Sequence, residues 1–590
     1  MAKPKYKKRK SDLIRKESRF RKFQPLLFIL PLVFIAFYPS LNNGFTNWDD
    51  ESLILNNPLI RNLSIDNIVK IFTTFYFGNF QPLHLFSYAI EYQLWELNPV
   101  GYHAFSLILF LITTTLVYYF IYRISGKNKT VAIIATLLFS INPMRVESVA
   151  WAAERKDMLY VLFYVAALIA YVNYLTKRDG RDGGHGRDEK DAGYRIKFLF
   201  YSFVFFVFAV FSKVMAVSLV GAMVMLDYFY ARKITLRLIL EKIPFVALSI
   251  FLGLVQIRAT ASTATIDVSS QFNFFDRILI VCRNLMFYLY KMIVPVNLSA
   301  FYPYPPRSSE IPWPVEFYIA PLFAILLLVL VIWLFRKNRL VVFCIGFSVS
   351  ALALVLQYIA IGPTMFNERY SLIPAIAVSF GLASGIGYLI TGFSSWKKYI
   401  LGLTGIYLLV MMYLTMLRCD VWQNSLTLWD DVLKQFPRVS LALNNRGEYS
   451  GKVLNKMPTA MADFNASIRF DPKFEKAYSN RGIVYAMQGK QDSALSDFST
   501  AIELKSDYYE ALFNRGLIYA MQEKPELAIP DFSRCIGLRP DEAMLYANRS
   551  QAFARTGNYV EALNDIELAR NLGFRIDTAY YRQLKQLVAQ

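Results

Sequence analysis

Three consecutive acidic residues, Asp49, Asp50 and Glu51, follow the first apolar run of the chain. Carboxylates held this close repel one another, so the pKa of at least one of them should rise. A carboxylate with a raised pKa can act as a general base or bind a cation. The triplet is equally compatible with a solvated loop or with the first turn of a helix, where acidic residues are common.

The residues before this triplet predict the side of a membrane on which it lies. Residues 24–41 form an apolar run long enough to cross a bilayer, and the tail at 1–23 contains eleven Lys and Arg residues against two acids. By the positive-inside rule the tail stays in the cytoplasm, and Asp49 and Asp50 emerge on the opposite side.

A second group of charged residues lies in a short connection between two later apolar runs. Ionisable groups near membrane depth are costly and are functional candidates by default. The group consists of Arg145, Glu147, Glu154, Arg155 and Asp157. Some of these residues could bind a substrate, and the alternative is that they simply pair with one another.

Two further cations could hold an anionic phosphate. Lys213 lies between two apolar runs and could act as a compact point charge, or it could extend its ammonium to the interface. Arg369 could clamp a phosphate with two hydrogen bonds, or pair with the neighbouring Glu368. Tyr302, in the aromatic loop 295–306, could stack on a sugar, line a lipid groove or belong to an interfacial aromatic belt.

Other kinds of site have weaker support in the sequence. His84 and His103 could in principle bind a metal, but their spacing does not resemble that of ligands, and core roles fit them better. The four cysteines are scattered and indicate neither disulfides nor a zinc site. No P-loop or dinucleotide fingerprint is present, which argues against an ATP-driven pump.

The elements that must position these residues are apolar helices. The chain is 55% hydrophobic and only 18% charged, which is too apolar for an ordinary soluble protein. Its net charge of +20 is concentrated in the tail and in short loops, so we interpret it as a topology signal and a contact with lipid, not with nucleic acid. About eleven spans are predicted at 24–41, 103–123, 131–149, 157–175, 197–211, 213–230, 243–258, 317–336, 340–361, 373–391 and 399–417.

The segment 274–294 is ambiguous because four charged residues interrupt its apolar pattern. If it lies along the interface, the basic clusters at 336–339 and 397–398 both fall in the cytoplasm, as the positive-inside rule requires. The number of crossings is then odd. The C-terminal region is therefore expected on the same side as Asp49.

Residues beyond about 420 follow a different pattern. The triplets that begin at Asn480, Asn514 and Asn548 recur every 34 residues, with an earlier copy at Asn445 one residue out of phase. This period resembles the tetratricopeptide repeat, a helical hairpin that stacks into a curved array. The expected domains are a membrane domain at 24–417, a linker helix at 418–439, about four repeats at 440–575 and a capping helix at 576–590. The array could bind a protein segment on its concave face or serve only as a spacer.

Together these features resemble the TMTC family of transmembrane and tetratricopeptide-repeat O-mannosyltransferases, and more broadly the GT-C glycosyltransferases. The resemblance rests on Trp48-Asp49-Asp50, residues 142–159, Ser212-Lys213, residues 279–305, residues 367–370 and the terminal repeats. Family members usually carry His where this chain has Asn142 and Arg145, and often Glu where it has Val214.

The resemblance implies an all-α membrane bundle of the GT-C type that transfers a sugar from a polyprenyl or dolichyl phosphate to Ser or Thr of a protein held by the repeats. In this family Asp49 or Asp50 would be the catalytic base, and the sugar would be transferred with inversion. The implied phosphate ligands are Lys213, Arg369, Arg155 and Arg145, and the implied supporting residues are Glu147, Asp157, Glu368, Tyr370 and Tyr302. The resemblance leaves a divalent metal on the carboxylates open.

Two other function classes are compatible with the same sequence. One is a non-catalytic membrane anchor that presents the repeats to an envelope or secretion complex. The other is a transporter or flippase, which should bury its charges in mid-span, whereas the informative charges here gather at one predicted face.

Overall fold

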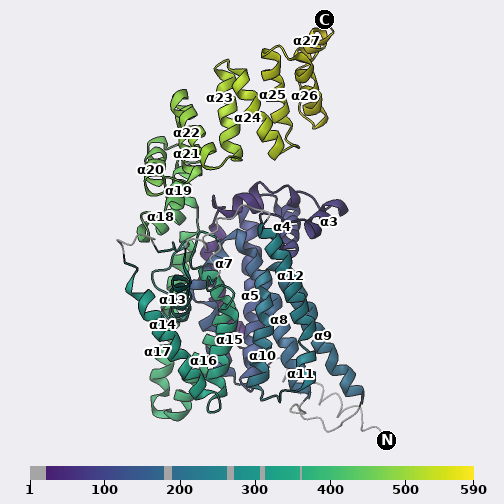
Figure 1. The fold of residues 1–590 in the computed structure, drawn as a ribbon. Coiled ribbons are helices and arrows are strands. Elements are labelled where there is room, and N and C mark those ends of the chain that lie inside the picture. The colour runs from purple at the N-terminus through teal and green to yellow at the C-terminus, as the bar shows by residue number, and fades with distance from the viewer. Residues whose placement is uncertain (1–20, 179–188, 262–271, 306–311, 359–361, 590) are drawn as a thin grey trace. The chain divides into compact units, whose positions relative to one another are not determined.

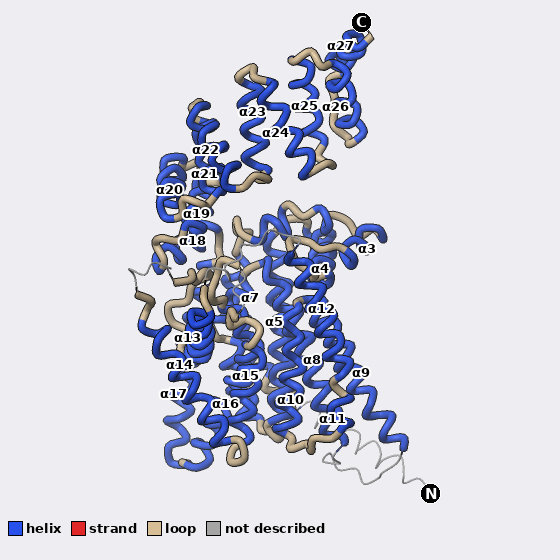
Figure 2. The backbone as a smooth tube through the Cα atoms, in the orientation of Figure 1, coloured by secondary structure: helices blue, strands red, loops and turns tan. Residues whose placement is uncertain are grey.

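The computed structural model describes residues 21–178, 189–261, 272–305, 312–358 and 362–589. The chain divides into two compact units, Met1–Asp431 and Val432–Gln590 (Figure 1). The described residues form helices, turns and loops, with two isolated β-bridges and no strand (Figure 2). This confirms the predicted all-α fold, in which a helical membrane unit precedes helical repeats.

The first unit consists of long apolar helices joined by short helical turns. Its helices are α2 Leu26–Phe37, α3 Ile65–Thr73, α4 Pro82–Trp95, α5 Pro99–Ile124, α6 Lys129–Ser140, α7 Val146–Ala150, α8 Arg155–Arg178, α9 Glu189–Ser212, α10 Leu219–Phe229, α11 Leu236–Leu240, α12 Ile243–Ala261, α13 Phe274–Ile293, α14 Val315–Leu334, α15 Arg339–Leu352, α16 Leu372–Gly392, α17 Lys397–Val421 and α18 Ser425–Gln435. Short helical turns that matter below are η2 Glu51–Leu55, η4 Pro143–Arg145, η5 Ala152–Glu154, η6 Val214–Ser218 and η8 Glu368–Ser371.

Each predicted span coincides with a helix of this unit, but the helices differ in length. Six of them are long and apolar enough to cross a membrane, and a bent pair, α6 with the residues up to Ala150, could make a seventh. The other four predicted spans correspond to shorter apolar helices. α13 is not among the candidate spans, and its place along the interface stays a prediction.

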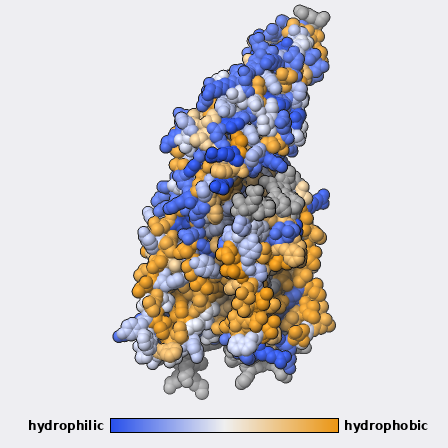
Figure 3. Space-filling view, turned by 60° about the vertical axis from the view of Figure 1, so that its left-hand side comes forward, coloured by the Kyte–Doolittle hydropathy of each residue, from blue (hydrophilic) through white to orange (hydrophobic). Residues whose placement is uncertain are grey.

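The outer faces of several helices are apolar and uncovered. In α14 only 11% of the apolar window is buried, so Leu322, Leu326 and Trp333 are largely exposed. Figure 3 shows apolar residues gathered over the face of the first unit in that view. Soluble proteins rarely expose continuous apolar patches of this extent, whereas hydrocarbon solvates them readily.

The second unit is a series of four helical hairpins followed by one further helix. The hairpins are α19 Ser440–Lys452 with α20 Met457–Phe470, α21 Glu475–Met487 with α22 Gln491–Leu504, α23 Tyr509–Met521 with α24 Pro525–Leu538, and α25 Ala543–Arg555 with α26 Tyr559–Asn571, and the last helix is α27 Thr578–Val588. We call the first helix of each hairpin its A helix and the second its B helix.

The glycine of the repeated triplet permits close packing within each hairpin. A Cβ added to Gly482 would lie 2.8 Å from the Phe498 ring, which is too close for any side chain. Gly516 is under the same constraint. In the fourth hairpin both partners change, because Ser550 replaces the glycine and Ile566 replaces the phenylalanine.

The arginine of the same triplet joins each hairpin to the one before it. Arg481 donates to both carboxylate oxygens of Asp497 on its own B helix, at 2.8 Å each. Its third nitrogen donates to Asn465 Oδ1 of the preceding B helix at 2.8 Å. The arrangement recurs around Arg515 and Arg549, so the repeat register is maintained by charged side chains as well as by apolar packing.

Candidate active site

The candidate site begins where the third predicted span breaks. Asn142 Oδ1 accepts from the amide of Met144 at 3.0 Å, and its amide group donates to the carbonyl of Met292 at 3.0 Å. Pro143 cannot continue α6, so the chain bends by 59° and re-enters the bundle through η4, α7 and η5. Residues 142–155 are all buried, so their charged side chains require partners inside the protein.

Six charged residues form one network, which we call the ionic cluster; four come from residues 147–157 and two from distant loops. Its members are Glu147, Glu154, Lys156, Asp157, Lys213 and Arg369. Three carboxylates therefore face three cations. Balanced charges and short contacts are what a low-dielectric interior requires if ionised groups are to remain there.

Arg369, from η8, joins two of the acids. Its guanidinium pairs with Glu147 and lies 3.3 Å from Glu154 Oε1, and its backbone amide donates to Glu147 Oε2 at 2.9 Å. The guanidinium also lies over the rings of Trp151 and Tyr370, at 5.6 and 5.2 Å. Arg369 and Tyr370 are half-buried, so this part of the cluster meets the surface of the unit.

Lys213 contacts two acids of the cluster, Asp157 and Glu154. It pairs with Asp157 and lies 3.6 Å from Glu154 Oε2, while Ser148 donates to the second oxygen of Asp157 at 3.1 Å. Its ammonium lies 5.1 Å from the centre of the Tyr370 ring. Lys213 and Arg369 therefore share Glu154 and Tyr370, although they lie more than 150 positions apart in the sequence.

Asp50 attaches the acidic loop to the segment that carries the cluster. Its Oδ1 accepts from the amide of Ala153 at 2.7 Å, and its Oδ2 accepts from the amide and hydroxyl of Thr46 at 2.8 and 2.9 Å. Burial raises the pKa of Asp50 to about 7, against the lowering effect of these hydrogen bonds, and the negative charge of Asp49 adds to the rise. Asp50 is 1% exposed, whereas Asp49 is half-buried.

The residue before the two acids lies against a stack of tryptophans. Trp48 stacks on Trp151 with ring centres 4.7 Å apart, and Trp151 stacks on Trp422 at 5.0 Å. Trp429 packs on Trp48 at 5.0 Å and donates to Asn47 Oδ1 at 2.9 Å. Since Arg369 lies over the same Trp151 ring, the stack runs directly from the acidic loop to the ionic cluster.

Arg145 differs from the other buried cations of the site. It is fully buried, and within the described residues its Nη2 donates to Ser371 Oγ at 2.5 Å. Its Nε and Nη1 have no hydrogen-bond partner there, and no carboxylate forms an ion pair with it. A buried guanidinium with two vacant donors is costly unless it binds something else.

Arg155 lies apart from the ionic cluster. It pairs with Glu91 of α4 at 2.6 Å and donates to Ser106 Oγ at 2.9 Å and to the carbonyl of Tyr102 at 2.5 Å. These partners hold α4 and α5 against the start of α8. Burial raises the pKa of Glu91, and the adjacent guanidinium opposes that rise.

Glu368 and Tyr302 form a neighbouring pair outside the cluster. Tyr302 donates from its hydroxyl to Glu368 Oε1 at 2.9 Å, and Arg418 approaches the same oxygen at 3.7 Å. Arg418 also pairs with Asp431 at 2.6 Å. Tyr302 is buried, so its ring cannot stack on a sugar without a rearrangement.

Two features of the site could not be anticipated as such from the sequence. His84 is 1% exposed, neither ring nitrogen has a partner among the described residues, and burial together with the nearby charge of Lys156 lowers its pKa well below the ordinary value. The acidic loop is also fastened to the region before the repeats, because the amide of Asn47 donates to Ser425 Oγ at 2.8 Å and that of Gly44 to the carbonyl of Gln423 at 2.9 Å.

In the described part of the chain no three His, Cys, Asp or Glu side chains are grouped so as to hold a metal ion.

The geometry combines three chemical capacities in one region. The acidic loop offers a half-buried carboxylate at Asp49, next to the tryptophan stack. The ionic cluster offers fixed positive groups whose charge is already balanced, and Arg145 offers vacant donors. Such an arrangement suits a reaction in which a proton leaves one group while negative charge develops on another.

Known proteins with similar sequences include a repeat family and several named enzymes. A family model described as tetratricopeptide repeat matches residues 479–543. Curated relatives include protein O-mannosyl-transferase F38B6.6 of Caenorhabditis elegans, 27% identical over 27% of this chain and 24% of its own length, and TMTC3 and TMTC1 of Homo sapiens. TMTC3 is 28% identical over 25% of this chain and 16% of its own length, and TMTC1 is 29% identical over 22% and 16%.

The aligned stretches span at most about a quarter of the length of these curated relatives. All three relatives are named protein O-mannosyl-transferases, and TMTC3 and TMTC1 carry the name of the family that the sequence resembles. Among solved structures, MamA covers 25% of this chain and 85% of its own with 21% identity and a TM-score of 0.23. The tetratricopeptide-repeat protein YrrB covers 25% and 74% with 18% identity and a TM-score of 0.24.

Proposed function

We propose that this chain is a multi-pass membrane glycosyltransferase that moves mannose or another hexose from a polyprenyl or dolichyl phosphate to a Ser or Thr hydroxyl of a protein. The observation that carries the proposal is the hydrogen bond from the Ala153 amide to Asp50 Oδ1, which attaches the acidic loop to the segment of the ionic cluster. A base and a set of phosphate-stabilising cations are thereby held in one region. The names of the curated relatives favour the same activity.

In this proposal Asp49 and Asp50 have different roles. Asp49 removes the proton of the acceptor hydroxyl, whose oxygen attacks the anomeric carbon of the sugar. The bond from that carbon to the phosphate oxygen breaks, its electron pair leaves with the lipid phosphate, and the sugar is transferred with inversion. Asp50 positions the loop, because both of its oxygens already accept hydrogen bonds.

The phosphate interacts with cations in two ways. Arg145 contacts it through Nε and Nη1, which have no partner within the described chain. Lys213 and Arg369 keep their carboxylate partners and stabilise the departing phosphate through their field, which acts strongly in a site that excludes water. Glu147 and Asp157 hold these two cations in place, and Arg155 holds α4 and α5.

The positive-inside rule supports one orientation for this reaction. The N-terminus lies in the cytoplasm, and the acidic loop and the repeats lie on the opposite side, where the acceptor would be bound by the concave face of the repeats. The donor enters from the lipid between apolar helices.

Substitution of the base tests the proposal directly. The purified protein in nanodiscs, supplied with polyprenyl-phosphate mannose and a Ser/Thr-rich acceptor polypeptide, should transfer sugar. Asp49→Asn should lower the rate at least 100-fold, because general base catalysis contributes about 10²–10⁴-fold. The matched control is Asp66→Asn, an exposed acid in the first turn of α3, which should transfer at the wild-type rate.

Thermal unfolding of both variants should match that of the wild type, so that a lost rate reflects chemistry and not folding. Full activity of Asp49→Asn would refute the assignment of the base. No sugar transfer by the wild type from any polyprenyl-phosphate hexose would refute the proposed reaction.

A further inference from the structure

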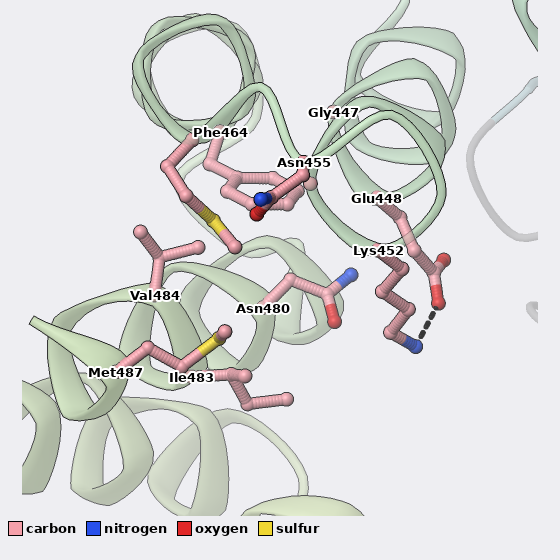
Figure 4. Close-up of a pocket in the computed structure, with 11 residues that line it drawn as sticks. Gly447, Glu448, Lys452, Asn455, Phe464, Asn480, Ile483, Val484 and Met487 are labelled. Atoms are coloured by element: carbon pink, nitrogen blue, oxygen red, sulfur yellow. Dashed lines mark hydrogen bonds and ion pairs between the residues drawn. The ribbon is translucent and has the colours of Figure 1, made fainter.

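An apolar pocket of about 320 Å³ lies between the first and second hairpins of the second unit. Figure 4 shows Phe464, Ile483, Val484 and Met487 around it, with Asn480 beside them. The walls come from α19, α20 and α21. A pocket lined in this way suits one bulky apolar side chain.

The rim of this pocket is suited to a polypeptide main chain. Asn480 Nδ2 donates to Asn444 Oδ1 at 3.0 Å, and an amide side chain has further donor and acceptor capacity for a peptide group. Lys452 at the rim is already paired with Glu448, as Figure 4 shows, so this opening presents no unpaired charge there. Met487 is 66% exposed, and its flexible thioether can adapt to a ligand.

An equivalent pocket of about 190 Å³ lies two hairpins later. Its lining occupies the same positions of the 34-residue repeat, since Pro525, Phe532, Asn548 and Ala552 stand where the first pocket has Met457, Phe464, Asn480 and Val484. One substitution changes its chemistry, because Arg555 takes the place of Met487.

The charge of Arg555 is available to a ligand. It is exposed, and its Nη1 donates to the carbonyl of Ala520 at 2.9 Å. Within the described residues no carboxylate pairs with it. A cation beside a small pocket that retains the amide of Asn548 favours an acidic side chain.

We propose that the A helices of the repeats bind one extended polypeptide segment, with a bulky apolar side chain in the first pocket and an Asp or Glu side chain at Arg555. Naming that segment as part of the acceptor rests on the proposed function. α21 contacts both α19 and α23, and packed helices lie about 8–10 Å apart, so two steps along the A helices span roughly 20 Å. An extended chain covers that distance in about six residues, at about 3.3 Å each.

The inference is tested with synthetic peptides and the full-length protein in nanodiscs. The probe is a fluorescein-labelled Gly/Ser/Thr peptide with one Leu and one Glu six residues apart, made in both orders. Fluorescence anisotropy should show that one order binds at least tenfold more tightly than the matched peptides with Leu→Ser or Glu→Gln.

Variants of each pocket should alter only the corresponding preference. Ile483→Gln with Met487→Gln should remove the preference for Leu, and Arg555→Glu should reverse the preference from Glu to Lys. Val560→Gln is the control, because Val560 is an exposed apolar residue of α26 that lines neither pocket. Unfolding temperatures should be the same for all variants.

Equal binding of all peptides, or preferences that survive both pocket variants, would overturn the inference. The result is independent of catalysis, because Asp49→Asn should bind the peptide as the wild type does. Peptide selectivity without any sugar transfer would refute the proposed function and leave the inference standing. Sugar transfer without selectivity would refute the inference alone.

Discussion

Two arginines of this site have opposite relations to stability. Arg369 is half-buried and joins two buried carboxylates, whereas Arg145 is fully buried and forms no ion pair within the described chain. Breaking a buried pair typically costs about 3–5 kcal/mol. A buried charge without a carboxylate partner is itself unfavourable, so an apolar side chain of similar volume at that position removes this cost. The two arginines should therefore respond differently to the same substitution.

Arg145→Met should unfold at the same temperature as the wild type or higher, because Ser371 Oγ keeps its own bond to the carbonyl of Glu368. The same variant should bind the lipid-phosphate donor about 10- to 100-fold more weakly, since a charge-assisted hydrogen bond contributes about 1.5–3 kcal/mol. Arg369→Met should instead unfold at a clearly lower temperature. Donor titrations and thermal unfolding distinguish them, and a less stable Arg145→Met would contradict the assignment of vacant donors.

Asp50 predicts a pH dependence of stability. Its pKa of about 7 in the folded protein exceeds the ordinary value of 3.8, so the folded state binds the proton more tightly. The resulting stabilisation is complete below about pH 4 and is lost as the pH rises through 7. The full range amounts to about 4 kcal/mol, at about 1.4 kcal/mol for each pKa unit.

The measurement compares the wild type with Asp50→Asn, which cannot titrate, by thermal unfolding at pH 4.5 and 7.5. Because Asp50 is protonated at pH 4.5, the amide of the variant resembles it closely, and the two proteins should unfold at similar temperatures there. At pH 7.5 only the wild type has lost the proton-linked stabilisation, so the variant should be the more stable of the two. A difference in unfolding temperature that is the same at both pH values would contradict the raised pKa.

At the scale of elements, the repeats show how a glycine and an aromatic ring depend on each other. In the first three hairpins a glycine faces a phenylalanine, and in the fourth Ser550 donates to the carbonyl of Ala562 while Ile566 occupies the phenylalanine position of the repeat. Gly482→Ser should cost about 1–3 kcal/mol, because overpacking forces neighbouring groups apart. Adding Phe498→Ile should recover part of that loss.

A double-mutant cycle by thermal or chemical unfolding checks this coupling. Gly537→Ser is the matched control, since a Cβ at Gly537 meets no neighbouring atom within 4 Å. Strictly additive effects of the two substitutions would contradict the packing argument.

Most of the helices could be predicted from the sequence, but the bend in one of them and the ion pairs between helices could not. The apolar runs located all six helices that are long and apolar enough to cross a membrane, because crossing the hydrocarbon requires about twenty apolar residues in succession. The sequence also showed Asn142-Pro143, but apolarity alone did not reveal that the chain bends there and buries Arg145. The partners of the repeat arginines were missed because they lie 16 positions later in the chain, on the other helix of the hairpin; they are Asp497, Asp531 and Asp565.

The candidate site was predictable in composition and less so in pairing. Asp49, Lys213, Arg369 and Glu147 were identified by type and by predicted side, which follow from counting charges and spans. Which cation faces which acid depends on side-chain directions within a folded bundle, and no local pattern records them. Arg155, for example, has the charge of a phosphate ligand but pairs with Glu91 of a different helix.

At the scale of the whole molecule, the predicted topology can be measured without activity. With an odd number of crossings, an exposed repeat residue such as Gln488 should lie outside and the loop at Ser394 inside. On a background with Cys282→Ser, Gln488→Cys should react with a membrane-impermeant maleimide in intact cells. Ser394→Cys should react only after permeabilisation, and the reverse pattern would move the repeats to the cytoplasm.

The tryptophan stack gives the acidic loop an optical signature. Four of the eight tryptophans of the chain, Trp48, Trp151, Trp422 and Trp429, lie in this one group. Indole rings at 4.7–5.0 Å couple their electronic transitions, so the group should give an exciton band in near-ultraviolet circular dichroism. Because Trp48 directly precedes Asp49, this circular dichroism band should report a movement of the acidic loop in unlabelled protein when a donor or an acceptor binds.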